Sequence, residues 1–466
     1  MPTSRSDKLE NQGIGRLLLD FSVPAIIGMM VHATYNIVDR IFIGQAVGSL
    51  GISAITVTFP IMLVLMAFGM LIGLGATALV SIRLGQRNKE DAERILGNAF
   101  VLLIVVNAVV GLTVWFSLHP ILRMIGASHD VLPMAEAYAR IILMGAVFQG
   151  IGFGLNNIIR GEGSPRIAMA TMLIGALLNI VLDALFIFGF GMGVRGAALA
   201  TVLSQMTTAA WVLGYFVSGR SLLRLHWAHL RPRMSLCWSI CAIGSAPFAM
   251  QIAASLIITV FNRQLGVYGG DLAISVFGIV HSMAMMVMMP VFGISQGAQP
   301  IIGFNYGAEK YDRVKKTLLL AAVTASAVTT IGFVVAMASP ASIVRLFDEK
   351  DAKLIELGSH AIRCCFLVLP IIGFQIVGAN YFQAVGKPKS AMFLSLSRQV
   401  ILLLPGLILW PRLFGLGLDG VWLALPVSDL GASILTAVWL TREIRGLGRK
   451  HRDLTEQMVP LDGISI

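Results

Sequence analysis

Apolar runs of about 20 residues recur along the whole sequence, which a soluble domain does not show. A helix of this length crosses the hydrocarbon core of a bilayer, whereas the ~10-residue alternating strands of a barrel are absent. Only 13% of the residues are charged, against about 25% in ordinary globular proteins. We therefore predict an all-α integral membrane protein with twelve transmembrane helices, at 17–38, 50–73, 96–117, 133–158, 167–189, 196–217, 237–262, 272–298, 317–338, 357–382, 391–410 and 420–441.

Lysine and arginine are divided unevenly between the two sets of loops. Of the 35 basic residues, 24 lie in the two termini and in one set of loops, around 83–94, 160–166, 220–233, 310–316 and 387–389. The opposite loops carry 8. Because basic loops stay inside, we expect both termini on the cytoplasmic side of the membrane. The net charge of +11 then reports topology and does not indicate nucleic-acid binding.

The chain also repeats itself after about 223 residues. Ser22-Val23-Pro24 matches Ser245-Ala246-Pro247, and Gly163-Ser164-Pro165 matches Gly386-Lys387-Pro388. Each copy holds six spans, so the copies share one orientation and are related by a pseudo-two-fold axis along the membrane normal. Two such lobes around a central cleft are typical of transporters. We expect an N-terminal lobe at 1–217, a cytoplasmic inter-lobe loop at 218–236, a C-terminal lobe at 237–445 and a cytoplasmic tail at 446–466.

The apolar run 171–189 contains two polar residues, Asn179 and Asp183, four positions apart and hence on one helix face. An aspartate inside a membrane helix costs about 2.5–3.5 kcal/mol on insertion scales, so it faces a bundle interior or a water-filled cavity. Asp39 ends the first span and, like Asp183, falls in the outer half of the membrane. The two acids can share one cavity; alternatively, Asp39 is a solvated helix end paired with Arg40.

Neutral oxygen ligands occur at compatible depth. Asn157, Asn179 and Thr201 each offer an amide or hydroxyl oxygen near the two acids. Carboxylate, amide and hydroxyl oxygens together are hard ligands that suit Na⁺, whereas two adjacent carboxylates can instead hold a proton. The residues leave Na⁺ and H⁺ both open as the bound cation.

A second charged pair lies near mid-membrane in the other half of the chain. Asp429 is in the last predicted span and Arg398 in the one before it, at similar depth. They predict a buried ion pair that holds the second half together, with the alternative that one of them lines a substrate path. The repeat aligns Asp429 with Gln205 and Asp183 with Gly406, so the two halves carry different polar groups.

Methionine is concentrated in the eighth span, between His281 and Pro290. Its flexible side chain suits promiscuous apolar binding, although it also fills ordinary core and lipid-facing positions. Met286 is therefore a candidate contact for an apolar substrate.

Motifs for ATP-driven chemistry or zinc hydrolysis are missing from the sequence, since nothing reads Gly-x-x-x-x-Gly-Lys-Ser/Thr or His-Glu-x-x-His. The one match to Gly-x-Ser-x-Gly, at Gly293–Gly297, falls inside an apolar span and does not follow a strand as a nucleophile elbow does. We expect neither an enzyme nor a bound cofactor, and no metal beyond a possible Na⁺. Transport by such a chain is driven by an ion gradient or is passive.

Four stretches resemble the multidrug and toxic compound extrusion (MATE) exporters, above all the branch with the staphylococcal multidrug exporter. They are Asn36-Ile-Val-Asp39-Arg-Ile-Phe-Ile-Gly44, Asn179-Ile-Val-Leu-Asp183, Gly293-Ile-Ser-Gln-Gly-Ala-Gln-Pro300 and Arg398-Gln-Val-Ile-Leu-Leu-Leu-Pro405. The resemblance runs from about residue 15 to 445. It implies Na⁺- or H⁺-coupled antiport of small organic cations or other amphipathic drugs by alternating access, in a monomer surrounded by the lipids of a bacterial or archaeal plasma membrane.

The resemblance also implies site residues. A cation site of the family falls on Asp39, Asp183, Asn179 and Thr201, whereas the glutamate that another branch uses in the seventh span is replaced by Ser255. Candidates for the lining of the substrate cleft are Tyr35, Asn36, Gln296, Gln299, Met286, Arg398 and Asp429.

Two other classes of function stay open. A flippase for lipid-linked oligosaccharides, found on a related fold, needs a larger and more cationic cleft. A channel or a non-transporting membrane scaffold needs no coupling ion at all. The dependence of substrate flux on an imposed ion gradient distinguishes these from an antiporter.

Overall fold

The computed structural model describes residues 9–47, 49–125, 127, 129, 131–345 and 352–458. All regular elements among these residues are helices. Within these described residues, ten helices are long and apolar enough to cross a membrane, and two further pairs are bent helices that pass the same test together. Counting each bent pair as one span gives twelve, which agrees with the sequence-based prediction.

The first half of the chain forms six spans. Its elements are α2 (Ile14–Val47), α3 (Ser49–Gly85), α4 (Lys89–Phe116), the short α5 (Leu118–Ile125), the bent pair α6 (Leu132–Met144) and α7 (Ala146–Gly161), α8 (Pro165–Asp183) with the π-helical turn η1 (Ala184–Gly189), and α9 (Gly193–Val217). Asn88 caps α4, because its side chain accepts a 3.1 Å hydrogen bond from the backbone nitrogen of Asp91.

The second half follows a 3₁₀ turn, η2 (Trp227–Leu230), in the inter-lobe loop. Its elements are α10 (Met234–Gly307), α11 (Tyr311–Ala338), α12 (Pro340–Arg345), the bent pair α13 (Ala352–Cys365) and α14 (Leu369–Ala384), α15 (Pro388–Leu396), η3 (Ser397–Leu403), α16 (Leu404–Leu409), η4 (Leu413–Gly415) and α17 (Gly417–Met458). α10 comprises two predicted spans joined at Gly270, whose φ of 65° favours glycine. α17 continues beyond 446, so the predicted tail begins as helix.

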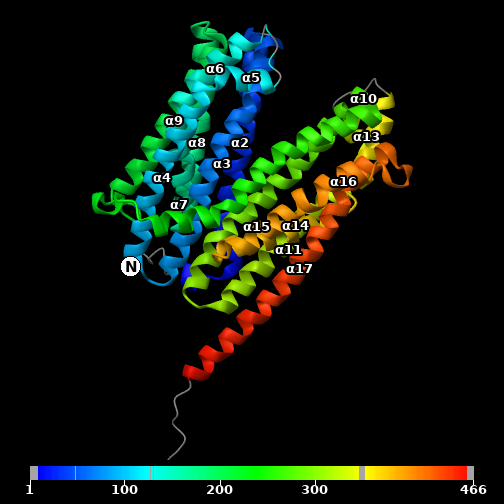
Figure 1. The fold of residues 1–466 in the computed structure, drawn as a ribbon. Coiled ribbons are helices and arrows are strands. Elements are labelled where there is room, and N and C mark those ends of the chain that lie inside the picture. The colour runs from blue at the N-terminus through cyan, green and yellow to red at the C-terminus, as the bar shows by residue number, and fades with distance from the viewer. Residues whose placement is uncertain are drawn as a thin grey trace, which may run out of the picture.

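The two halves form two groups of helices that lean apart (Figure 1). They meet at the end that carries the α3–α4 and α10–α11 loops, which we call the basic end, and diverge towards the opposite end. The repeat is visible in the helices themselves: α6 and α7 meet at 54°, and their counterparts α13 and α14 meet at 49°. Each half also has one π-helical segment, η1 and η3.

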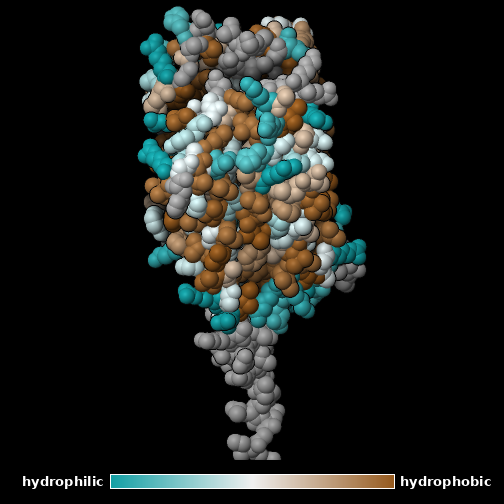
Figure 2. Space-filling view, turned by 90° about the vertical axis from the view of Figure 1, so that its right-hand side faces the viewer, coloured by the Kyte–Doolittle hydropathy of each residue, from teal (hydrophilic) through white to brown (hydrophobic). Residues whose placement is uncertain are grey.

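The outer surface suits a bilayer. Large apolar side chains are exposed along one face of α4, at Val105, Val109 and Leu112, and along α11, at Leu319 and Val323. Figure 2 shows hydrophobic residues over the middle of one face, with hydrophilic ones at its lower end and also in its upper part. Because lipid tails are as apolar as these side chains, the helices are held together by close packing more than by the hydrophobic effect.

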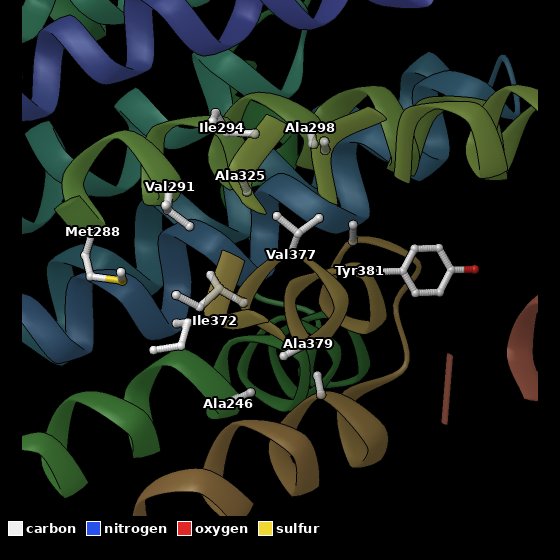
Figure 3. Packing of buried hydrophobic residues seen from close by; sticks show 14 of the residues in the cluster. Ala246, Met288, Val291, Ile294, Ala298, Ala325, Ile372, Val377, Ala379 and Tyr381 are labelled. Carbon is white, nitrogen blue, oxygen red and sulfur yellow. The ribbon is translucent and has the colours of Figure 1, made fainter. Parts of the chain in front are cut away.

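Packing in the C-terminal lobe brings α10, α11 and α14 together. Val291 and Ile294 of α10 and Ile372 and Val377 of α14 are all buried, together with Ala325 of α11 (Figure 3). The small side chain of Ala325 among branched ones lets the helix backbones approach.

The two lobes touch along α3 and α10 through glycine. A Cβ added to Gly75 would lie 2.1 Å from the carbonyl oxygen of Ile240, and one added to Gly244 would lie 1.7 Å from that of Leu71. The same close approach occurs near the ends of both helices, at Gly85 and Gly307. We call this contact the seam. Any side chain at these glycines would push the lobes apart.

Candidate cation site in the N-terminal lobe

Asp183 is the last residue of α8, directly before the π-helical turn η1. Its side chain is 0% exposed, and within the described part of the chain neither carboxylate oxygen has a hydrogen-bond partner. A buried carboxylate with no partner is strongly unfavourable unless it binds a proton or a cation. Single π-helical turns inside α-helices are frequent at functional sites, and this one lies where Asp183 is presented.

Neutral oxygens lie one turn away. Asn179 is buried on the same face of α8, and its Nδ2 donates a 3.5 Å hydrogen bond to Oγ1 of Thr201 on α9. The Oδ1 atom of Asn179 accepts no hydrogen bond from the residues that the structure describes. With Nδ2 turned towards Thr201, the Asn179 carbonyl oxygen is available as a ligand.

Asp39 belongs to the same site. It is 8% exposed on α2, which packs along α8, and it acts electrostatically on Asp183. Phe42 of α2 meets Phe188 of η1 edge-to-face, with 5.4 Å between ring centroids, one turn beyond Asp39. Two buried carboxylates repel one another, and a shared cation or proton relieves the repulsion. The structure thus brings Asp39, Asp183, Asn179 and Thr201 together.

Asn157 makes its contacts elsewhere. It lies on α7, where its Nδ2 donates to the carbonyl oxygen of Phe153 at 2.8 Å and its Oδ1 accepts from Arg160. Arg160 also donates to Oε1 of Gln296 on α10, across the junction of the two lobes. The prediction that Arg160 lies in a basic loop is wrong, because the residue is inside α7 and is 7% exposed. Two candidate site residues, Asn157 and Gln296, are therefore partners of Arg160.

The other candidates for the cleft lining are scattered. Gln299 is buried on α10, and its Nε2 has no hydrogen-bond partner among the residues described. Met286 is 79% exposed on the same helix. Tyr35 and Asn36 lie on α2, but their side chains are outside the described part of the structure.

Arg398 and Asp429 form an ion pair in the C-terminal lobe. The Nε atom of Arg398 donates to Oδ1 of Asp429, which is buried. This confirms the pairing suggested by their similar depth. Asp429 therefore has a cationic partner, unlike Asp183, and the two buried aspartates have different chemistry.

A buried acid at the basic end escaped the sequence analysis. Glu162 is 0% exposed directly after α7, where it accepts hydrogen bonds from the hydroxyl of Tyr215 and from Oγ of Ser221. It also accepts from the backbone nitrogen of Leu223 at 3.3 Å. Because Ser221 and Leu223 lie in the inter-lobe loop, Glu162 attaches that loop to the N-terminal lobe. The only signal in the sequence was an acid next to the end of an apolar span.

Comparison with known proteins assigns both halves of the chain to one family model. The MatE model matches residues 24–185 and again residues 246–408. The second match starts about 222 residues after the first, which confirms the internal repeat.

Curated proteins similar to the chain include the multidrug export protein MepA of Staphylococcus saprophyticus, 27% identical over 436 residues that cover 93% of this chain and 95% of the relative. MepA of Staphylococcus aureus strain MSSA476 is also 27% identical, over 435 residues, with the same coverage of both chains.

Solved structures of two transporters resemble the whole chain. The MATE multidrug transporter DinF-BH, solved in complex with a ligand, is 42% identical, with a TM-score of 0.87 over 94% of this chain and 98% of that one. An outward-facing MATE family transporter of the MOP superfamily is 25% identical, with a TM-score of 0.90 over 96% of this chain and 99% of that one.

Proposed function

The chain belongs to the MatE family of multidrug efflux transporters, and from this premise we propose that it exports amphipathic, often cationic, organic compounds in exchange for Na⁺ or H⁺. We infer cation coupling from Asp183, a fully buried carboxylate whose oxygens have no hydrogen-bond partner in the described part of the chain. A site of this kind takes up a cation and is strained without one. The named relatives support the choice of substrate, since MepA is a multidrug exporter and DinF-BH is a multidrug transporter that was solved with a bound ligand.

α2 offers a physical route from the cation site to the lobes. Asp39 lies on α2 beside α8, and towards the other end of the same helix Ser22 touches α10. A Cβ on Gly297 of α10 would lie 2.7 Å from the backbone nitrogen of Ser22, so a shift of α2 displaces its contact with the other lobe. Pro24 gives the helix a point at which it can bend. Neutralising Asp39 and Asp183 changes how α2 packs on α8, and we propose that this change biases the two lobes between alternate arrangements.

Orientation and location follow the same proposal. The basic end faces the cytoplasm of a bacterial or archaeal cell, both termini are cytoplasmic, and the protein works as a monomer in the plasma membrane. In the arrangement of Figure 1 the lobes touch at the basic end and diverge at the other, which is the arrangement expected for release of a drug to the outside.

The proposal is tested with proteoliposomes loaded with ethidium. Efflux is measured under an imposed Na⁺ gradient and then under a pH gradient, for the wild type and for Asp183→Asn. The matched control is Asp419→Asn, the same change at an aspartate that is 55% exposed and paired with His360. We expect one gradient to drive efflux in the wild type and in the control, and not in Asp183→Asn.

Normal gradient-driven efflux by Asp183→Asn would contradict the proposed role of Asp183. If neither gradient moves the dye in the wild type, drug antiport itself is contradicted, and a lipid-linked substrate becomes the better hypothesis.

A further inference from the structure

A buried cation lies where the two lobes meet. Arg160 of α7 is 7% exposed, and its guanidinium donates to Oδ1 of Asn157 in its own lobe and to Oε1 of Gln296 in the other. Among the residues that the structure describes, no acidic side chain forms an ion pair with it. A guanidinium that is buried with only amide oxygens as partners depends strongly on each of them.

Gln296 lies where three helices, α2, α7 and α10, meet. The adjacent Gly297 touches Ser22 of α2, and Gly293, one turn earlier on α10, touches Ile26. Gln296 reaches from this contact to Arg160 on α7. Separation of the lobes at the basic end therefore has to break the Arg160–Gln296 hydrogen bond.

The glycine contacts of the seam cannot hold the lobes in one defined arrangement as the Arg160–Gln296 hydrogen bond can. They are van der Waals contacts between backbones, which weaken gradually as the helices move apart. A hydrogen bond from a buried cation is directional and is either made or lost. In the repeat, Arg160 aligns with Gln383, which is buried in the C-terminal lobe and is neutral, so this cation exists on one side of the seam only.

We propose that Arg160 and Gln296 form a polar latch that holds the lobes together at the basic end and sets how readily they separate there. The latch deepens the proposed function and rests on it, because a latch matters only to a protein whose lobes alternate. Arg160 and Gln296 are positioning residues: they act on the arrangement of the lobes, whereas the acids of the N-terminal lobe act on the cation.

The latch is tested by measuring the distance between the lobes at the basic end. Spin labels replace two exposed acids, Glu90 of α4 and Asp312 of α11, in a chain whose four cysteines have been changed to alanine. Pulsed electron–electron distance measurements in nanodiscs then give the fraction of molecules with separated lobes. Loss of a hydrogen bond to a charged group should raise the ratio of separated to closed molecules by roughly tenfold in Gln296→Leu and in Arg160→Gln.

Two further variants distinguish a latch from general damage. Gln296→Glu gives Arg160 a counter-charge and should lower the separated fraction below that of the wild type. The exchange Arg160→Gln with Gln296→Arg restores a donor and an acceptor across the seam and should return the distribution towards the wild type.

The matched control is Ser295→Ala. It removes the 2.7 Å hydrogen bond from Asn380 to Ser295, one residue from Gln296 but within the C-terminal lobe, and it should leave the inter-lobe distance unchanged. An unchanged distribution in Gln296→Leu, or an equal shift in Ser295→Ala, would overturn the latch.

Ethidium efflux of the wild type is measured in parallel. Distance shifts without gradient-driven efflux would support the latch and contradict the proposed function.

Discussion

Two buried aspartates in similar helical surroundings have opposite environments. Asp429 accepts a hydrogen bond from Arg398, whereas both oxygens of Asp183 have no such partner in the described part of the chain. The protein itself supplies the positive charge that balances Asp429. The charge of Asp183 has to be balanced by a proton or a cation that binds there. Asp429 is therefore suited to stabilise the fold, whereas Asp183 is suited to bind a transported cation.

Asp429→Asn should therefore destabilise the protein. It leaves the side chain of Arg398, which is 27% exposed, without its ion pair, and we expect a loss of about 2 kcal/mol, below the 3–5 kcal/mol typical of fully buried pairs. Thermal unfolding in detergent measures the change. Adding Arg398→Gln should recover part of the loss, because it removes the unpaired charge. A stability equal to that of the wild type for Asp429→Asn would show that the pair contributes nothing.

At the scale of helices, α3 and α10 pack closely because both have glycine at their contact positions. The Cβ that Gly244 does not have would fall 1.7 Å from a backbone carbonyl oxygen of α3, whereas a Cβ on Gly278, further along α10, would meet nothing within 4 Å. One glycine permits contact between the lobes, and the other is free to change.

Gly244→Ala should accordingly weaken the seam, because the methyl group meets backbone that cannot rotate away. We expect a loss of about 1–3 kcal/mol, typical of overpacking, together with a larger inter-lobe distance at the basic end. Gly278→Ala is the control, since alanine favours helix over glycine by about 1 kcal/mol and meets no neighbour. Thermal midpoints of the two variants are compared, and a neutral or stabilising effect of Gly244→Ala would contradict the description of the seam.

The N-terminal segment is a second connection between the lobes at the basic end. Glu10 pairs with Lys310 of the α10–α11 loop at 2.9 Å and with Arg87 of the α3–α4 loop at 3.4 Å. The hydrogen bond from Lys310 is the largest effect on Glu10 and holds the pKa of its carboxyl below the ordinary value of 4.5. A depressed carboxyl pKa stabilises the folded state above the unfolded pKa, and that contribution is lost as the pH falls through the folded pKa.

Glu10→Gln should lower stability by less than about 1 kcal/mol, because the pairs lie near the surface. The difference from the wild type should stay constant between about pH 5 and 8 and shrink only below the ordinary pKa of 4.5. Unfolding midpoints measured across this range test the prediction. A difference that changed between pH 6 and 8 would mean that another group controls this contact.

At the scale of the whole molecule, the sequence predicts the features that depend only on the order and spacing of residues along the chain. Span length, the 223-residue repeat and the spacing of Asn179 and Asp183 are linear properties, and each is found in the structure. The burial of Arg160 and Glu162 could not be predicted, because it depends on segments distant in sequence. Gln296 accepts a hydrogen bond from Arg160, and Ser221 of the inter-lobe loop donates one to Glu162. The contacts of Asn157 were unpredictable for the same reason, since its partner was assigned to a loop.

The overall arrangement joins these scales. We propose that the candidate cation site in one lobe, the helix that runs from it towards the other lobe, and a seam of glycine backbones with a polar latch couple the two movements. In the C-terminal lobe the repeat places Gly406 where the N-terminal lobe has Asp183, and the ion pair of that lobe lies at other positions. The proposed coupling is therefore asymmetric, with the cation bound in the N-terminal lobe.

The central claim, that drug and cation movements are coupled through Asp183, is tested most directly in reverse. Proteoliposomes are given a gradient of ethidium and no cation gradient, and the movement of Na⁺ and of H⁺ is recorded. We expect dye that moves down its gradient to drive one of the two cations uphill in the opposite direction, and Asp183→Asn to abolish this counter-movement. Dye flux in the wild type with no movement of either cation would contradict the account and indicate a channel.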